Sequence, residues 1–310
     1  MALALRRVWI NLLLHPAHSL PNAAVPIFVA AGLAAHDGTF EALPTLVAFL
    51  GSWLIHVAGV FTDNHELLRR YPGIVEHPDL TEALADRTVT LGQIRVAIAA
   101  CLLLALPSAF FFLPIGGFPV LLLGAIGVAA SIGYSAGPLP YARLGLAEAV
   151  FFTMFGIVAV AGTYYVQVAW RRAAAGELAS FGKLPLAAFL VGLPAGALVT
   201  NVLMIDDLRD RHFDAAKRWS TIAVRFGVRG SRFAYASMSA LAYAAPLLAV
   251  ATGAFAAWAL LPLLTLPWAW SIGKTIRTHD DLETLTPMTP RASMLACTYA
   301  ALWGIGLALG

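Results

Sequence analysis

Charged side chains are scarce in this chain of 310 residues. Aspartate, glutamate, lysine and arginine together make up 12% of it, whereas apolar residues make up 60%, and the mean hydropathy is +0.78. Soluble domains carry about 25% charged residues, so this composition excludes an ordinary soluble fold and indicates a protein embedded in a bilayer. The basic pI, near 9.0, is therefore interpreted as a sign of membrane topology and not of nucleic-acid binding.

Cysteine is scarce as well. Cys101 and Cys297 are the only two, and both lie within apolar segments without metal-ligand spacing. His65 and His212 stand among polar residues, but neither has a second histidine or cysteine at the spacing that zinc requires. The sequence therefore argues against a zinc site, and the two cysteines are interpreted as packing residues.

Long apolar runs dominate what remains. Residues 1–18 are too short to span, lack a small-residue cleavage site, and are predicted to form an amphipathic helix in the membrane interface. Nine later runs reach the roughly 20 residues that cross a bilayer. The expected fold is an all-α membrane protein, one domain over residues 1–310 with nine transmembrane helices in a single bundle. The nine runs are 19–36, 41–62, 91–113, 117–134, 146–168, 184–205, 230–252, 255–272 and 291–309.

Basic residues are distributed unevenly between the connecting segments. With the N-terminus placed inside, only Arg171, Arg172 and Lys183 of the 20 lysines and arginines fall outside, which leaves 17 inside. The positive-inside rule favours this orientation. It predicts that the N-terminus and the acidic loops 63–90 and 206–229 are cytoplasmic and that the C-terminus is outside. The expected location is a bacterial inner membrane.

Four aspartates follow the sixth apolar run directly, in the stretch IDDLRDRHFD. On a helix, Asp207, Asp210 and Asp214 follow steps of three and four and would share one face with repelling charges. Capping of a helix start explains one or two such acids but explains four poorly. Together with Asp206, they predict a site for a divalent metal, Mg²⁺ carrying a diphosphate.

A second acidic segment follows the second apolar run, in FTDNHELLRR. Asp63 and Glu66 stand three apart and could reach one cation from the same face. Two such segments facing each other across a bundle could hold a metal-bound anion. Nearby arginines fit phosphate oxygens bidentately, with binding of lipid head groups as the alternative for each. These arginines are Arg69, Arg70, Arg87, Arg143, Arg209, Arg218 and Arg225.

The stretch DDLRDRHFDAAKRWSTIAVRFG resembles the second aspartate-rich motif of the UbiA-type intramembrane prenyltransferases, including a tail from Thr221 to Gly227. The loop GYSAGPLPYARLGLAEAVF and the segment GTYYVQ are similar to the branch that prenylates 1,4-dihydroxy-2-naphthoate. The resemblance covers the whole chain and implies a central cavity that opens to the cytoplasmic side. Two positions depart from the family pattern: Gly59 and Val60 replace Asn-Asp, and Arg218-Trp219-Ser220-Thr221 replaces Gly-Lys-Arg-Thr.

The resemblance implies Mg²⁺-dependent transfer of a prenyl group from a prenyl diphosphate to a lipophilic aromatic acceptor. Asp63, Asp207 and Asp210 are the implied catalytic acids, and Tyr134 and Tyr164 are the implied aromatic lining for a prenyl cation, with ordinary packing as the alternative. The implied metal ligands are Asp63, Glu66, Asp206, Asp207, Asp210 and Asp214. The implied diphosphate ligands are Arg69, Arg87, Arg143, Arg209 and Arg218.

Two alternative functions stay open at this point. The same fold could support terpene cyclisation or prenylation of a non-quinone acceptor, because the first acidic motif is depleted. A non-enzymatic transporter or lipid-binding protein is the other class, but the expected spans contain only Glu41 and Glu148, both near a span's start. The expected partners are a prenyl diphosphate, the acceptor and membrane lipids, without nucleic acid. Prenyl chain length, acceptor identity and oligomeric state are not determined by the sequence.

Overall fold

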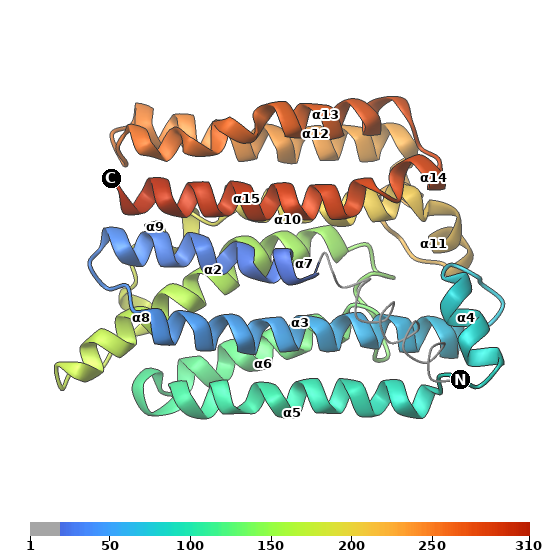
Figure 1. Ribbon diagram of the computed structural model, residues 1–310, viewed down its shortest axis with the longest axis horizontal. Coiled ribbons are helices and arrows are strands. Elements are labelled where there is room, and N and C mark those ends of the chain that lie inside the picture. The colour runs from blue at the N-terminus through green and yellow to red at the C-terminus, as the bar shows by residue number, and fades with distance from the viewer. Residues whose placement is uncertain (1–18) are drawn as a thin grey trace.

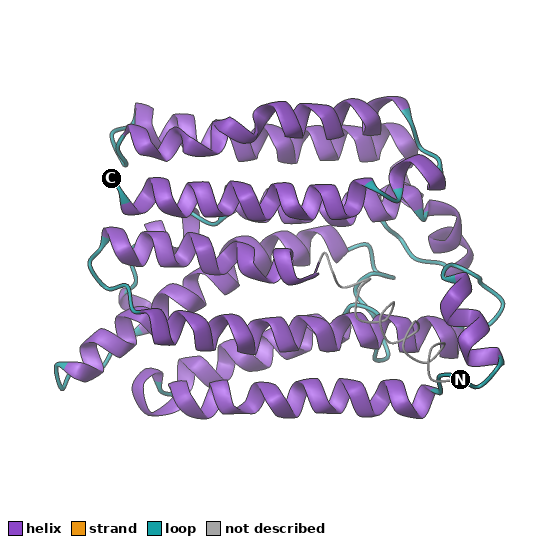
Figure 2. Cartoon of the chain, viewed as in Figure 1, coloured by secondary structure: helices purple, strands orange, loops and turns teal. Residues whose placement is uncertain are grey.

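The computed structural model describes residues 19–310, so the interfacial helix predicted for residues 1–18 lies outside the described residues. Long helices lie side by side along the longest axis of the molecule (Figure 1). Over the described range the chain contains no β-strand (Figure 2), which confirms the all-α expectation. The helices in chain order are α2 (Ser19–His36), α3 (Ala42–Arg70), α4 (Pro78–Ala85), α5 (Leu91–Gly116), α6 (Phe118–Gly133), α7 (Ala147–Thr153), the π-helix η2 (Met154–Val158), α8 (Ala159–Ala174), η3 (Phe181–Lys183), α9 (Ala187–Leu190), α10 (Leu193–Arg209), α11 (Arg211–Lys217), α12 (Ile222–Ala251), η4 (Ala257–Thr265), α13 (Leu266–Thr278), α14 (Leu282–Leu285) and α15 (Met288–Ala308).

Five helices of the described chain are long and apolar enough to cross a membrane. Two further apolar helices, Leu20–His36 and Phe118–Gly133, are shorter. The predicted number of nine spans therefore stays a prediction. The five long helices are Ala42–Arg70, Leu91–Gly116, Ala147–Ala174, Ala187–Arg209 and Ile222–Ala251.

Several helices continue past the ends of the apolar runs. The predicted acidic loop 63–90 contains the last two turns of α3 and the whole of α4, and the predicted loop 206–229 contains the end of α10, all of α11 and the start of α12. Hydropathy marks where side chains become polar, whereas backbone hydrogen bonding continues until a cap or a turn ends it. Both segments are therefore largely helical, and their acids occupy fixed positions.

Close approaches of glycine backbones hold the centre of the bundle together. A Cβ atom added to Gly32 of α2 would lie 2.2 Å from the carbonyl oxygen of Gly304 in α15. One added to Gly196 of α10 would lie 2.4 Å from the Cα atom of Gly156 in the π-helical turn. Lipid tails are as apolar as leucine, so helices in a bilayer associate through such dense contacts and not through a hydrophobic gain. These crossings fix α2, α10 and α15 relative to the segment that leads into α8.

The polar segments gather at one end of the bundle. In Figure 1, α4, α11 and α14 lie at the same end, together with the C-terminal ends of α3 and α10. The connection between α2 and α3 and the chain's C-terminus lie at the opposite end. This arrangement brings the two acidic segments, which are far apart in the sequence, to one place.

Candidate functional site

Carboxylates from four helices converge at the end of the bundle that carries α4 and α11. Asp63, near the end of α3, lies beside Ser135 and within electrostatic range of Lys217. Asp207, in the last turn of α10, interacts with Asp214 of α11 and with Glu148 of α7. The exposed fractions of Asp207, Asp214 and Glu148 are 5%, 3% and 6%, so these acids are buried and water screens them little.

A buried lysine, Lys217, pairs with two acids at this end of the bundle. The Lys217 Nζ atom is 2.7 Å from Glu76 Oε2 and 3.0 Å from Asp214 Oδ1, and it lies 4.0 Å from the centroid of the Trp219 ring. Burial alone would lower the pKa of Lys217, but the Asp214 and Glu76 carboxylates outweigh it and hold the pKa above its ordinary value. The ammonium therefore stays charged and joins α11 to the segment before α4.

The acids carry more negative charge than Lys217 can balance. Burial raises the pKa of Asp214 to about 7 even though Lys217 acts in the opposite direction. The Oδ2 atom of Asp207 is buried without a hydrogen-bond partner among the described residues. Such an atom is costly unless something neutralises or coordinates it. A further cation at this end of the bundle would stabilise both carboxylates.

The donor set fits Mg²⁺, which prefers carboxylate oxygens and binds through one or two of them plus substrate phosphates. Between residues 19 and 310, no three acidic, histidine or cysteine side chains already stand close enough together to hold a metal by themselves. A diphosphate that supplies oxygens between Asp63 on one side and Asp207 and Asp214 on the other would complete such a site.

The expectation that Asp207, Asp210 and Asp214 share the face of one continuous helix is wrong. Helix α10 ends at Arg209, and Asp210, with φ −95° and ψ 10°, connects it to α11. No proline or glycine marks this break, so the spacing alone could not reveal it. Asp207 and Asp214 nevertheless interact electrostatically across this break.

Arg209 forms ion pairs with the other two aspartates of the cluster, Asp206 and Asp210. Its Nη1 atom is 2.7 Å from Asp206 Oδ1, and its Nε donates to Asp210 Oδ1 at 2.8 Å. Thr289 of α15 also donates to Asp206 Oδ1, at 2.6 Å. Burial raises the pKa of Asp210, with Arg209 acting in the opposite direction. Asp206, Arg209 and Asp210 thus form an ion-pair cluster of their own, and their metal and diphosphate roles remain predictions.

Glu66 also has partners of its own. Its carboxylate lies 2.9 Å from His65 Nδ1, 2.6 Å from Arg69 Nη2 and 2.5 Å from Arg70 Nε. Arg70 donates in addition to the Gly137 carbonyl at 2.9 Å, which ties the end of α3 to the loop after α6. The structure therefore joins Glu66 to Arg69 and does not bring it to Asp63 through a shared contact. Its role as a metal ligand remains a prediction.

Four of the predicted phosphate-binding arginines are exposed and make no ion pair with a described residue. Arg87 and Arg218 both adopt positive φ, 61° and 59°, at the ends of α4 and α11. Positive φ is uncommon outside glycine, and here it ends each short helix and directs the chain onward. The four guanidinium groups stay available for an anion, and they belong to Arg87, Arg143, Arg218 and Arg225.

Aromatic rings border the carboxylates on one side. Tyr134, at the end of α6, packs edge to face against Tyr141, Phe151 and Trp219, with ring centroids 5.5, 5.9 and 5.6 Å away. The ring lies within electrostatic range of Asp207, Asp63 and Asp214. Tyr134 is therefore close to the acids, and its role as a lining for a prenyl cation remains a prediction.

Tyr164 lies elsewhere. Its hydroxyl donates to Asp37 Oδ2 at 2.5 Å, in the turn after α2, at the opposite end of the bundle from α4 and α11 (Figure 1). It follows Glu148 by sixteen positions along one nearly continuous helix, which corresponds to about 24 Å. The structure does not bring this residue to the carboxylates, and its predicted role as aromatic lining there receives no support from the geometry.

Three residues of this cluster did not emerge from the sequence as ligands of the site: Glu76, Glu148 and Lys217. Glu148 lies in the first turn of α7 and accepts a hydrogen bond from the Ile222 backbone N–H at 2.8 Å, which joins α7 to the start of α12. An acid at the start of an apolar run was the available signal for Glu148. A lysine three positions after Asp214 was the corresponding signal for Lys217.

Comparison with known proteins places the chain in context. Residues 23–286 match the UbiA prenyltransferase family. A 1,4-dihydroxy-2-naphthoate octaprenyltransferase of Mycobacterium leprae is 28% identical over 280 residues, covering 87% of this chain and 86% of that protein. The Escherichia coli protein of the same name is 24% identical, covering 94% and 92%. A UbiA homolog from Aeropyrum pernix K1 has the same fold, with a TM-score of 0.63 at 18% identity, covering 91% and 96% of the two chains.

Proposed function

The chain belongs to the UbiA prenyltransferase family and is a membrane-embedded prenyltransferase, and from this premise we propose that it transfers a prenyl group from a prenyl diphosphate to an aromatic acceptor of the 1,4-dihydroxy-2-naphthoate type. The observation that carries this proposal is the convergence of Asp63 and Asp214 on the Lys217 ammonium, with the Asp207 carboxylate beside Asp214. Two relatives that bear the name of this naphthoate reaction match most of the chain, which supports the choice of acceptor.

Two acidic segments would hold the metal complex of the diphosphate. Asp63 would contribute from α3, and Asp207 and Asp214 would contribute from α10 and α11. When bound, Mg²⁺ neutralises the diphosphate and acts as a Lewis acid on the leaving group. The orphaned Asp207 Oδ2 atom and the raised pKa of Asp214 support a cation at this position.

Cationic side chains of the protein would bind the diphosphate oxygens directly. Lys217 is fixed between Glu76 and Asp214, and its ammonium can donate to a phosphate oxygen that enters between these carboxylates. Arg87, Arg143 and Arg218 are exposed at the same end and can close over the outer phosphate. Charge stabilised in this way helps the allylic C–O bond to break.

The reacting carbon needs shelter from water while it carries positive charge. The rings of Tyr134, Phe151 and Trp219 pack together beside the acids and exclude water there. Their faces can stabilise a cation by about 0.5 to 2 kcal/mol each. The acceptor carbon then attacks the prenyl carbon, the diphosphate leaves with the electron pair of the broken C–O bond, and the acceptor ring becomes aromatic again by losing a proton, or its carboxyl group as CO2, to the surroundings.

The proposed enzyme crosses the membrane nine times and has a cavity that opens to the cytoplasm. Five long apolar helices and two shorter ones support a polytopic arrangement. Among the lysines and arginines, only Arg171, Arg172 and Lys183 lie on segments predicted to be outside. This asymmetry supports a cytoplasmic location for the acidic end, where Mg²⁺ and phosphorylated substrates are supplied.

The experiment that tests this function incubates purified protein with radiolabelled prenyl diphosphates of several chain lengths, Mg²⁺ and a panel of acceptors. The proposal expects diphosphate release and a prenylated product that both require 1,4-dihydroxy-2-naphthoate or a close analogue. Diphosphate release with a cyclic hydrocarbon and no acceptor would instead identify a cyclase. Prenylation of a non-aromatic lipid alone would overturn the acceptor class and leave the diphosphate site in place.

A further inference from the structure

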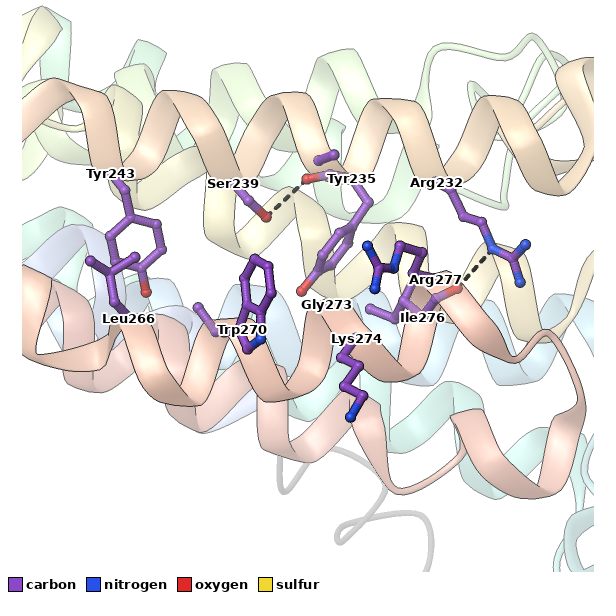
Figure 3. Close-up of a pocket in the computed structure, with 12 residues that line it drawn as sticks. Arg232, Tyr235, Ser239, Tyr243, Leu266, Trp270, Gly273, Lys274, Ile276 and Arg277 are labelled. Carbon is purple, nitrogen blue, oxygen red and sulfur yellow. Dashed lines mark hydrogen bonds between the residues drawn. The ribbon is translucent and has the colours of Figure 1, made fainter.

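A groove of about 280 Å³ lies between α12 and α13 (Figure 3). Its described lining contains no aspartate or glutamate, so it is separate from the carboxylate site. Tyr235 and Tyr243 of α12 are buried at its base, whereas Trp270 of α13 is 72% exposed. The Tyr243 hydroxyl is 2.7 Å from the Thr265 hydroxyl, so this polar end is satisfied and the ring presents an apolar surface.

Three basic residues line this groove: Arg232 and Arg277 lie toward one end of it, and the Lys274 side chain points away from both, at its rim (Figure 3). Arg232 donates from Nε to the Ile276 carbonyl at 2.8 Å and from Nη2 to the His279 carbonyl at 3.1 Å, so it is fixed but has no carboxylate partner among the described residues. Lys274 and Arg277 are exposed and form no ion pair with the part of the chain that the structure describes. This end of the groove therefore carries uncompensated positive charge.

Of the three acids that follow α13, Asp280 and Asp281 are already in use, and the exposed Glu283 of α14 forms no ion pair with a described residue. Asp280 lies 2.9 Å from the Arg211 guanidinium, and Asp281 accepts from the Thr284 backbone N–H at 2.8 Å as the cap of α14. Neither can neutralise the three bases without losing its present partner. A negatively charged group from outside the chain would neutralise the basic residues at this end of the groove.

A glycine keeps the middle of the groove open. Gly273 faces the ring of Tyr235, and a Cβ atom added there would lie 3.8 Å from Tyr235 Cε1, which is ordinary contact. Any longer side chain at this position would enter the space between Tyr235 and Trp270. The groove thus combines a cationic end with a narrow apolar channel along the helices.

We propose that this groove binds an anionic phospholipid, with the phosphate at Arg232 and Arg277, Lys274 attracting the head group from the rim, and an acyl chain in the channel over Gly273. A phospholipid joins a negative head group directly to an apolar chain, which is the order of chemistry along the groove. Basic pockets between membrane helices bind anionic head groups, and each lysine or arginine near the surface strengthens that attraction. The inner location predicted for these bases puts them at head-group depth.

Lipid binding is measured by native mass spectrometry of detergent-purified protein titrated with phosphatidylglycerol or phosphatidylcholine. We expect wild type to bind phosphatidylglycerol at least tenfold more tightly than phosphatidylcholine. Lys274→Gln and Arg277→Gln should each weaken phosphatidylglycerol binding roughly fivefold. The matched control is Arg229→Gln, an exposed base on α12 outside the groove, which should change it by less than about twofold.

Two substitutions at one position test the channel itself. Gly273→Leu fills the space and should weaken binding of phosphatidylglycerol about tenfold, whereas Gly273→Ala makes only ordinary contact and should leave it unchanged. If Arg229→Gln and Lys274→Gln weakened phosphatidylglycerol binding equally, the bases of the groove would attract lipid no more strongly than any other base at the interface, and the proposal would be overturned. A lipid-independent dimer that Gly273→Leu abolishes would assign the groove to a second copy of the chain, and the proposal would fail.

Discussion

Asp214 should make the stability of the metal-free protein depend on pH. Its pKa is raised from 3.8 to about 7 by burial, so the folded state binds this proton more tightly than the unfolded chain does. The stabilisation is fully present below about pH 4 and is lost as the pH rises through about 7. This difference in pKa corresponds to about 4 kcal/mol, of which roughly 3 kcal/mol is lost between about pH 5 and pH 8.

The assay follows thermal unfolding of the detergent-purified protein in a chelator, at several values between about pH 5 and pH 8. For a chain of this length, a loss of roughly 3 kcal/mol corresponds to a fall in Tm of about 4 to 5 °C. Asp210, whose pKa burial also raises, contributes with the same sign, so the comparison with Asp214→Asn isolates one group. That variant cannot ionise at this position and should lose most of the slope.

Mg²⁺ should oppose this loss, because metal and proton compete for the same carboxylate. Saturating Mg²⁺ with inorganic diphosphate should raise Tm more at about pH 8 than at about pH 5, and Asp214→Asn should remove the difference. Parallel pH profiles for wild type and Asp214→Asn in the chelator would refute the reasoning, since they would mean that this carboxyl does not titrate differently in the folded protein.

Three further outcomes are expected. Asp63→Ala should abolish prenyl transfer. Glu66→Ala, which removes a carboxylate paired with Arg69, should raise the Mg²⁺ requirement more than it lowers the maximal rate. Superimposable curves of rate against Mg²⁺ concentration for wild type and both variants would contradict a metal role for this segment. Cysteine-accessibility labelling should place residues 63–90 and 206–229 in the cytoplasm and 175–183 outside, and the reverse pattern would overturn the orientation. Tyr134→Leu should lower the maximal rate roughly twofold to thirtyfold, as expected for a loss of about 0.5 to 2 kcal/mol. Tyr164→Phe, at the opposite end of the bundle, should change the rate less than about twofold, and equal effects would contradict the assignment of Tyr134 to the aromatic lining.

The composition was enough to predict an all-helical membrane fold, and the cost of placing acids at a membrane boundary was enough to identify the aspartate cluster. Asp63, Asp207 and Asp214 lie at one end of the bundle because both acidic segments follow helices that run in the same direction. The common direction of these two helices can be predicted from the order of the apolar runs. The resemblance to UbiA-type prenyltransferases pointed to the same family that the comparisons show.

The side chains that pair with these acids could not be predicted from the sequence. Lys217 meets Glu76 only because α11 and the segment before α4 pack together, although 141 positions separate the two residues in the chain. The break at Asp210 carries no proline or glycine, so periodicity predicted one continuous helix face, whereas Asp210 lies between two helices and accepts a hydrogen bond from Arg209. Tyr164 was predicted to line the site because it belongs to the segment GTYYVQ. Its distance from the carboxylates depends on how far along the helix it lies, and the segment itself does not indicate that distance.

The most direct test of the central claim compares wild type with Asp207→Asn in the consumption of labelled prenyl diphosphate at saturating Mg²⁺ and acceptor. Asp207 has a buried carboxylate oxygen without a partner among the described residues, so the amide should be tolerated by the fold while the metal–diphosphate complex loses a ligand. The account predicts at least a hundredfold loss of diphosphate consumption at an unchanged or higher Tm. Turnover at the wild-type rate by this variant would contradict a metal–diphosphate site at the converging carboxylates.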